Sequence, residues 1–141
     1  MLAQDAPLTW AGAWAIMLPI GLLLIVSGLV VVGVAKRLAD GQIGMSGIAG
    51  IRTSATMSSP EAWSAAHRAG KKLTVIGGRT LSWSAAIAIG AGLWFGEGDP
   101  ERTTAVWAVV VGVSSVGVLV PILLGARAGH RAAVVVRDRN A

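Results

Sequence analysis

Residues Ala11–Ala35 read AGAWAIMLPIGLLLIVSGLVVVGVA, and no charged side chain interrupts them. A transmembrane helix needs about 20 consecutive, mostly apolar residues to cross a hydrocarbon core of roughly 30 Å. Two further stretches, Leu73–Phe95 and Thr104–Ala126, also meet that length. The second stretch contains one charge, Arg79, and the third contains none. The sequence therefore predicts an all-α membrane protein with three transmembrane helices.

The composition of the whole chain agrees with this prediction. Hydrophobic residues make up 54% and charged residues only 13% of the chain, which is about half the charged share of an ordinary soluble domain. The absence of cysteine excludes disulfides, thiolate metal sites and cysteine nucleophiles. The net charge of +5 comes from basic residues beside the spans. Anionic lipid headgroups, and not nucleic acid, are therefore the expected partners.

The distribution of basic residues predicts the orientation, because cationic side chains resist translocation. The segment 36–72 and the tail 127–141 are basic, whereas the acidic outer loop 96–103 holds three acids and one base. The N-terminal tail 1–10 contains Asp5 and no basic side chain. We expect the N-terminus outside and the C-terminus in the cytoplasm, in a multi-pass protein of the bacterial cytoplasmic (inner or plasma) membrane.

The first span differs from a cleaved signal peptide. Its positive charges, Lys36 and Arg37, follow the apolar run, whereas a signal peptide carries them before a shorter run. We therefore expect a retained membrane anchor. Four tryptophans support the same topology, since indole favours the headgroup boundary. They lie at the predicted outer ends of the spans: Trp10, Trp14, Trp94 and Trp107.

Small residues predict where the helices meet, because they let backbones approach closely inside lipid. Gly78, Ser82, Ala86 and Gly90 recur every four residues along the second span. We expect this ridge to be the main contact surface of the bundle. Whether its partner is another span or another subunit stays open. Arg79 lies on the same span and either snorkels to the cytoplasmic headgroups or has an internal polar role.

The cytoplasmic segment 36–72 contains the signals of a helix start. Ser58 and Glu61 have capping-box spacing, and Ser59 followed by Pro60 is an equally good N-cap and first-turn pair. We expect a short interfacial helix over about residues 60–70, which ends at Gly70 or continues into the second span.

Polar and small residues recur at fixed spacing through this loop: Gly50, Arg52, Thr53, Thr56, Ser58, Glu61, Trp63, His67, Arg68, Gly70 and Lys72. In this pattern the chain resembles the SdpI family, bacterial membrane proteins named for immunity to a sporulation-delaying toxin peptide. The resemblance covers about 30 residues and the flanking spans. It corresponds to the C-terminal three-span module of the longer members. The Pro-Trp pair that usually follows Arg-Thr in the family is Ser54–Ala55 here.

The resemblance implies an immunity or signalling protein that protects the membrane from a peptide toxin or recruits a cytoplasmic regulator. The loop residues that carry it are Gly50, Arg52, Thr53, Glu61, Trp63, His67 and Arg68. Arg52 can pair with a lipid phosphate, a partner carboxylate or Glu61, and His67 can hydrogen-bond to loop carbonyls. Two interpretations stay open: these residues bind a partner or headgroup, or they only lock the loop to the membrane surface.

The chain can instead be an accessory subunit that docks to a larger membrane complex through the ridge from Gly78 to Gly90. We expect no enzyme, because no nucleophile elbow, phosphate loop or paired intramembrane carboxylate appears. His67 and His130 have no metal-ligand spacing, so no metal or cofactor is expected.

Overall fold

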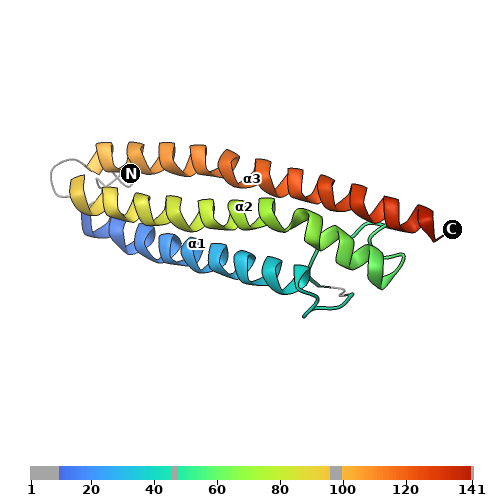
Figure 1. Cartoon of the computed structure of the whole chain (residues 1–141). Coiled ribbons are helices and arrows are strands. Elements are labelled where there is room, and N and C mark those ends of the chain that lie inside the picture. Colours follow the sequence, from blue (N-terminus) through green and yellow to red (C-terminus); the bar gives the residue numbers. More distant parts are fainter. Residues whose placement is uncertain (1–9, 46–47, 96–99, 141) are drawn as a thin grey trace, which may run out of the picture.

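The computed structural model describes residues 10–45, 48–95 and 100–140. These residues form three helices and no strand: α1 (Trp10–Ala39), α2 (Pro60–Phe95) and α3 (Pro100–Arg139). The helices lie along one another in an elongated bundle, and the loop between α1 and α2 lies toward the end where α3 terminates (Figure 1). The predicted all-α fold is confirmed.

Helix α2 is the central helix. It packs against both neighbours, whereas α1 and α3 contact each other little. A Cβ atom added to Gly78 would lie 2.9 Å from the carbonyl oxygen of Gly28 on α1. On the α3 side, a Cβ atom added to Gly70 would lie 2.9 Å from the carbonyl oxygen of Gly125. Glycines therefore permit close backbone approach on both sides of α2.

The predicted ridge contributes its first half to this packing. Gly78 contacts α1, and Ser82 Oγ donates a hydrogen bond of 3.0 Å to the carbonyl of Ile25. Ala86 and Gly90 are exposed, and a Cβ atom on Gly90 would meet nothing within 4 Å. Residues four apart drift by about 40° around a helix of 3.6 residues per turn, so the ridge turns away from α1.

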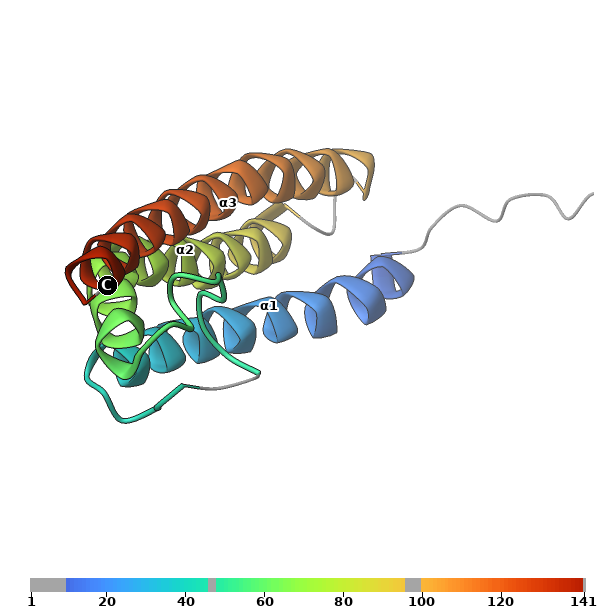
Figure 2. The ribbon, with the colours of Figure 1, turned by 90° about the vertical axis from the view of Figure 1, so that its right-hand side faces the viewer.

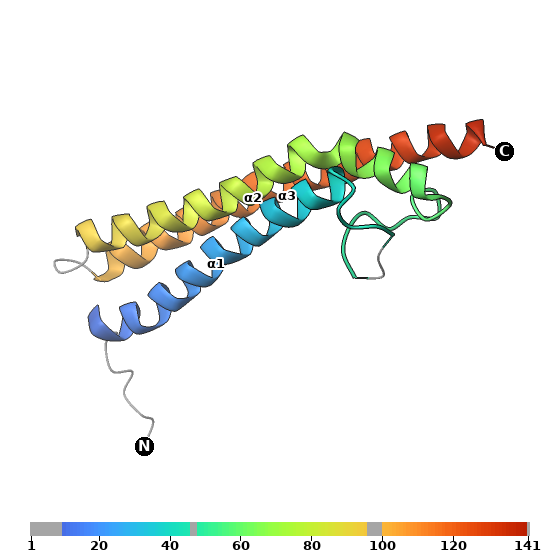
Figure 3. The same cartoon turned by 60° about the horizontal axis from the view of Figure 1, so that its bottom comes forward.

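The outer ends of the helices show the same divergence. Figure 3 shows α1 separating from the other two helices toward its N-terminal end. Trp107 fills part of this region, because it is only 6% exposed and its ring lies against both Gly21 and Gly92. Trp107 therefore packs inside the bundle, whereas Trp94 is exposed, as a boundary anchor would be.

Two helical stretches have the length and apolar composition needed to cross a membrane, Trp14–Ala39 and Glu101–Arg139. Only 11% and 6% of their apolar windows is buried inside the protein, whereas a core helix of a soluble protein is mostly buried. Large aliphatic side chains on both stretches face outward, among them Leu23, Leu29 and Val113. Outward apolar surfaces of this extent are typical of a membrane protein.

The predicted second span differs from the other two. It lies within α2, which has the required length but is not among the stretches that meet the apolar criterion. Arg79 and several serines and threonines lower the apolar content of this span. The third membrane crossing and the orientation therefore stay predictions.

The helices extend beyond the predicted spans. Helix α2 runs from Pro60 through Gly70 without a break, so the predicted short helix and the second span form one continuous helix. Helix α3 continues past Ala126 to Arg139, so most of the predicted basic tail is helical. Of the outer loop predicted over 96–103, residues 100–103 belong to α3, and residues 96–99 lie outside the described residues. The tail residues 1–9 lie outside them too.

Candidate functional site

The loop between α1 and α2 folds back over α2 and lies between α1 and α3 (Figure 2). His67, which is 6% exposed, connects α2 to this loop. Its Nε2 accepts a hydrogen bond of 3.0 Å from the Ile51 amide, and its Nδ1 lies 2.8 Å from the carbonyl oxygen of Trp63. Because an amide only donates and a carbonyl only accepts, the proton is on Nδ1 and the ring is neutral. Within the predicted loop segment 36–72, His67 thus bonds to one carbonyl, that of Trp63, and in addition accepts from one amide, that of Ile51.

Gly50 fits against two aromatic rings. Its φ of +108° lies in the region that favours glycine, and an added Cβ atom would collide with Nε2 of His67 and lie 2.8 Å from the ring of Trp63. Trp63 is 2% exposed, and its ring centroid lies 4.2 Å from that of His67. Trp63 Nε1 also donates to the carbonyl of Ile43 at 3.3 Å. A residue with a side chain at position 50 would displace this ring pair.

The side chain of Ile51 lies between α2 and α3. Its Cδ1 would be 3.3 Å from a Cβ atom on Gly70 of α2 and 2.6 Å from one on Gly129 of α3. Both glycines therefore leave space that Ile51 fills. The loop contributes an apolar wedge at the point where the two helices come together.

Two threonines fold the loop into a tight turn. Thr56, which is fully buried, accepts a hydrogen bond of 2.8 Å from the Thr53 amide, and its Oγ1 lies 2.8 Å from the carbonyl oxygen of Ile51. Thr53 Oγ1 is hydrogen-bonded to Nδ1 of His130 on α3 at 3.1 Å. The loop is therefore fixed to α2 and to α3. We call this set the loop clamp: Gly50, Ile51, Thr53, Thr56, Trp63, His67 and His130.

The start of α2 is capped by Ser59. Its Oγ accepts a hydrogen bond of 3.1 Å from the Ala62 amide, whereas Ser58 Oγ donates to the carbonyl of Ala55. Of the two predicted caps, the structure forms the pair of Ser59 and Pro60. Glu61 is exposed, and hydrogen bonds from its own backbone amide and from Ser59 hold its pKa below the usual 4.5. Its carboxylate therefore stabilises the helix start in the ionised form.

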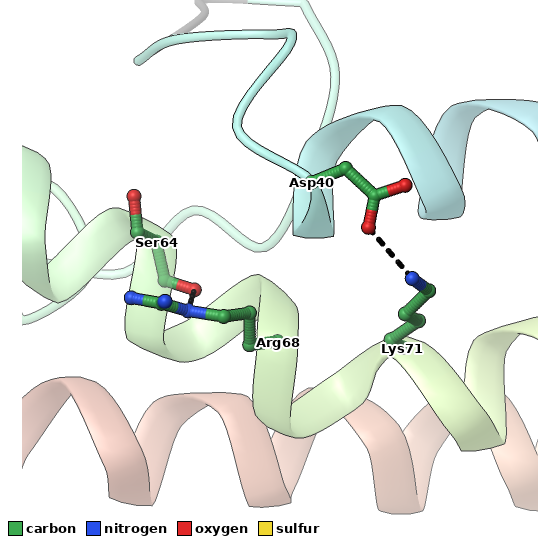
Figure 4. A network of polar contacts seen from close by, with 4 residues as sticks. All are labelled: Asp40, Ser64, Arg68 and Lys71. Atoms are coloured by element: carbon green, nitrogen blue, oxygen red, sulfur yellow. Dashed lines mark hydrogen bonds and ion pairs between the residues drawn. The ribbon is translucent and has the colours of Figure 1, made fainter.

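The basic residues of the loop and of α2 lie on the surface around the clamp. Arg52 is exposed, and Arg68 Nε donates to the carbonyl of Ser64 at 3.4 Å (Figure 4). Lys71 Nζ forms an ion pair of 2.7 Å with Asp40, which connects the end of α1 to α2 (Figure 4). Exposed pairs of this kind contribute little stability, on the order of 0–1 kcal/mol.

Arg79 lies on the outer surface of the bundle. It is exposed and lines a hollow of about 420 Å³ between α1 and α2, together with Trp83 and Ala86. This position faces the surroundings of the bundle, as a snorkelling side chain does, and lies away from the α2–α3 contact.

The structure brings together four of the predicted loop residues and separates three. Gly50, Thr53, Trp63 and His67 belong to the clamp, whereas the charged side chains Arg52, Glu61 and Arg68 are exposed around it. The site residues that the sequence analysis missed are Ile51, Thr56 and His130. The fixed spacing of the loop includes Thr56, but no local signal points to His130, which is 77 residues from Thr53.

The loop clamp and its surroundings therefore provide hydrogen-bonding groups and exposed charged side chains at the surface of the bundle. Within residues 10–45, 48–95 and 100–140, no group of three or more histidines and carboxylates is placed to hold a metal ion.

Comparison with known proteins bears on this loop directly. A family model described as the SdpI/YfhL protein family matches residues 42–125, which is more than half of the 141 residues. The matched region contains the loop from Gln42 onward, all of α2, and α3 up to Gly125. No curated protein and no solved structure matches the chain.

Proposed function

The chain belongs to the SdpI/YfhL protein family, and from this membership we propose that it protects a bacterial cytoplasmic membrane from a peptide toxin. The observation that carries the proposal is the loop clamp. The part of the loop that resembles the family pattern is fixed to α2 through His67 and to α3 through Thr53. The two attachments hold the residues of the family pattern in one fixed arrangement.

The clamp couples the position of the loop to the spacing between α2 and α3. Because Ile51 lies between Gly70 and Gly129, a change in the spacing of α2 and α3 also moves the loop. A toxin that binds one spacing better than the other shifts the balance between them. Movement of the loop then changes how two exposed cations, Arg52 and Arg68, bind an acidic surface of a cytoplasmic regulator or lipid headgroups. The protein acts in this scheme by binding and not by catalysis.

Survival of a toxin-sensitive strain tests the proposal. Cells that express the full chain are challenged with the sporulation-delaying peptide, at matched amounts of membrane-inserted protein. We expect the wild type to raise survival, Arg52→Ala and His67→Ala to abolish the gain, and the control Arg139→Ala to keep it. No gain with the wild type would contradict the immunity function. Full protection by both loop variants would remove the loop from the mechanism.

A second function is favoured by the free end of the small-residue ridge. Ala86 and Gly90 are exposed on α2, although small residues in spans usually mark helix contacts. An accessory subunit of a larger membrane complex would present such a surface to a partner helix. This function predicts a partner in fixed stoichiometry after mild detergent extraction, which Ala86→Leu removes. A chain that purifies alone under these conditions would contradict it.

A further inference from the structure

A cavity of about 610 Å³ lies beside the loop clamp, between α1, α2 and the loop. Its volume falls within the roughly 300–1,000 Å³ typical of small-molecule sites. Valines of α1 line one wall, residues from His67 to Thr74 of α2 line another, and Ile122 and Ala126 of α3 close the far side. Four of the residues that line the cavity also belong to the loop clamp: Gly50, Ile51, Thr53 and His67.

The cavity is apolar at one end and basic at the other. Val30, Val34 and Ile122 line its apolar part. Arg52 and Lys71 line its rim, and Thr53 adds a hydroxyl group there. Lys71 forms an ion pair with Asp40, and Arg52 adds a second cationic side chain to the lining. A ligand that fits both ends has an apolar chain and an anionic head.

The cavity also opens toward the surface that α1 exposes to its surroundings. Val30, which lines the cavity, is 56% exposed. It belongs to Trp14–Ala39, one of the two stretches apolar enough to cross a membrane. A lipid molecule beside α1 can therefore reach the cavity without passing through water.

We propose that this cavity holds one acyl chain of an anionic phospholipid, with the headgroup phosphate at Arg52. The guanidinium donates two parallel hydrogen bonds to phosphate oxygens in such a pair. The chain lies along the valines of α1, where it covers apolar surface between α1 and α3. The lipid then acts as a filler between two helices that contact each other little. Arg52 takes part in both proposals, but lipid binding is measured on the purified protein and toxin protection in cells, so the failure of one is distinguishable from the failure of the other.

Native mass spectrometry of the full chain in detergent tests the site. The probes are phosphatidylglycerol and phosphatidylcholine with identical acyl chains, each added in a dilution series. We expect one phosphatidylglycerol per chain, bound about fivefold or more tightly than phosphatidylcholine, which corresponds to one basic contact to an anionic headgroup. An excess of inorganic phosphate should not displace the lipid, because phosphate has no chain to occupy the apolar part.

Three variants separate the parts of the site. Arg52→Gln should remove the preference for phosphatidylglycerol, whereas Arg127→Gln, an exposed arginine of α3 that does not line this cavity, should keep it. Val34→Trp fills the apolar part and should weaken binding of both lipids severalfold. Ala126→Phe fills the same space from α3 and serves if Val34→Trp loses helical content by circular dichroism. Equal binding of the two lipids by the wild type, or equal effects of Arg52→Gln and Arg127→Gln, would overturn the proposal. Displacement of the lipid by phosphate alone would overturn it as well.

Discussion

The Ile51 amide donates a hydrogen bond of 3.0 Å to Nε2 of His67, across 16 residues of sequence. This bond joins the loop to α2 at the position where the Ile51 side chain enters the space between α2 and α3. A single residue of the loop is therefore held by its backbone on one helix and by its side chain between two.

Loss of the His67 ring should weaken the fold. In His67→Ala the Ile51 amide loses its acceptor and Trp63 loses its ring partner, at a cost of about 2–4 kcal/mol. Thermal unfolding of the detergent-solubilised protein measures the loss. Arg68→Ala, the next residue and an exposed one, should change the stability by about 0.5 kcal/mol at most. Equal effects of the two substitutions would show that the His67 bond does not hold the loop.

A side chain at position 50 should be far more costly than one at position 41. Both glycines have positive φ, +108° at Gly50 and +75° at Gly41, but only Gly50 lies against other side chains. Gly41→Ala carries backbone strain alone, about 1 kcal/mol. Gly50→Ala adds the collision with His67 and should cost about 2–5 kcal/mol. Limited proteolysis of the loop measures the difference between the two variants. Similar cleavage rates for both would contradict the close packing around Gly50.

Alanine should have opposite effects at two glycines of α2. Gly78→Ala forces the Gly28 carbonyl, and α1 with it, away from α2 and should destabilise the bundle by about 1–3 kcal/mol. Gly90→Ala meets open space in a helix and should stabilise it by about 0.5–1 kcal/mol. Unfolding by a denaturing detergent measures both. Destabilisation by Gly90→Ala would indicate a helix contact at that position.

Acid should loosen the start of α2. The pKa of Glu61 is lowered in the folded protein, so the ionised carboxylate stabilises the helix above about pH 4.5, and this contribution is lost as the pH falls through the folded pKa. The protection of the amides near Ala62, measured as their hydrogen-exchange rate relative to the intrinsic rate at each pH, should therefore fall between about pH 5 and pH 3. In Glu61→Gln this fall in protection should be absent. An unchanged pH profile in the variant would assign the effect to another group.

The sequence predicted the helices better than it predicted their contacts. Span-length apolar runs and the pair of Ser59 and Pro60 are local signals, and the structure has a helix at each. The small-residue ridge predicted the contact with α1 correctly for Gly78 and Ser82 but not for Ala86 and Gly90, because a four-residue repeat drifts around the helix. Three of the buried small residues of α2, Gly78, Ala85 and Gly92, are seven residues apart, a spacing that keeps to one face of the helix more closely.

The clamp required tertiary structure. Gly50, Trp63 and His67 lie within one motif, and a resemblance to a family is enough to select them. The pairing of Thr53 with His130 depends on how α3 lies against α2, and so does the space between Gly70 and Gly129 that Ile51 fills. No periodicity within a single segment contains that information.

Recruitment of a cytoplasmic regulator requires that the clamp faces the cytoplasm. The chain has no cysteine, so single cysteines can be introduced at Gln42, Glu101 and Arg139 and labelled in intact cells with a membrane-impermeant maleimide. We predict labelling at position 101 from outside, and labelling at positions 42 and 139 only after the cells are opened. This result requires that α2 crosses the membrane. Labelling of position 42 in intact cells, or of position 101 only in opened cells, would contradict a cytoplasmic clamp beneath three spans.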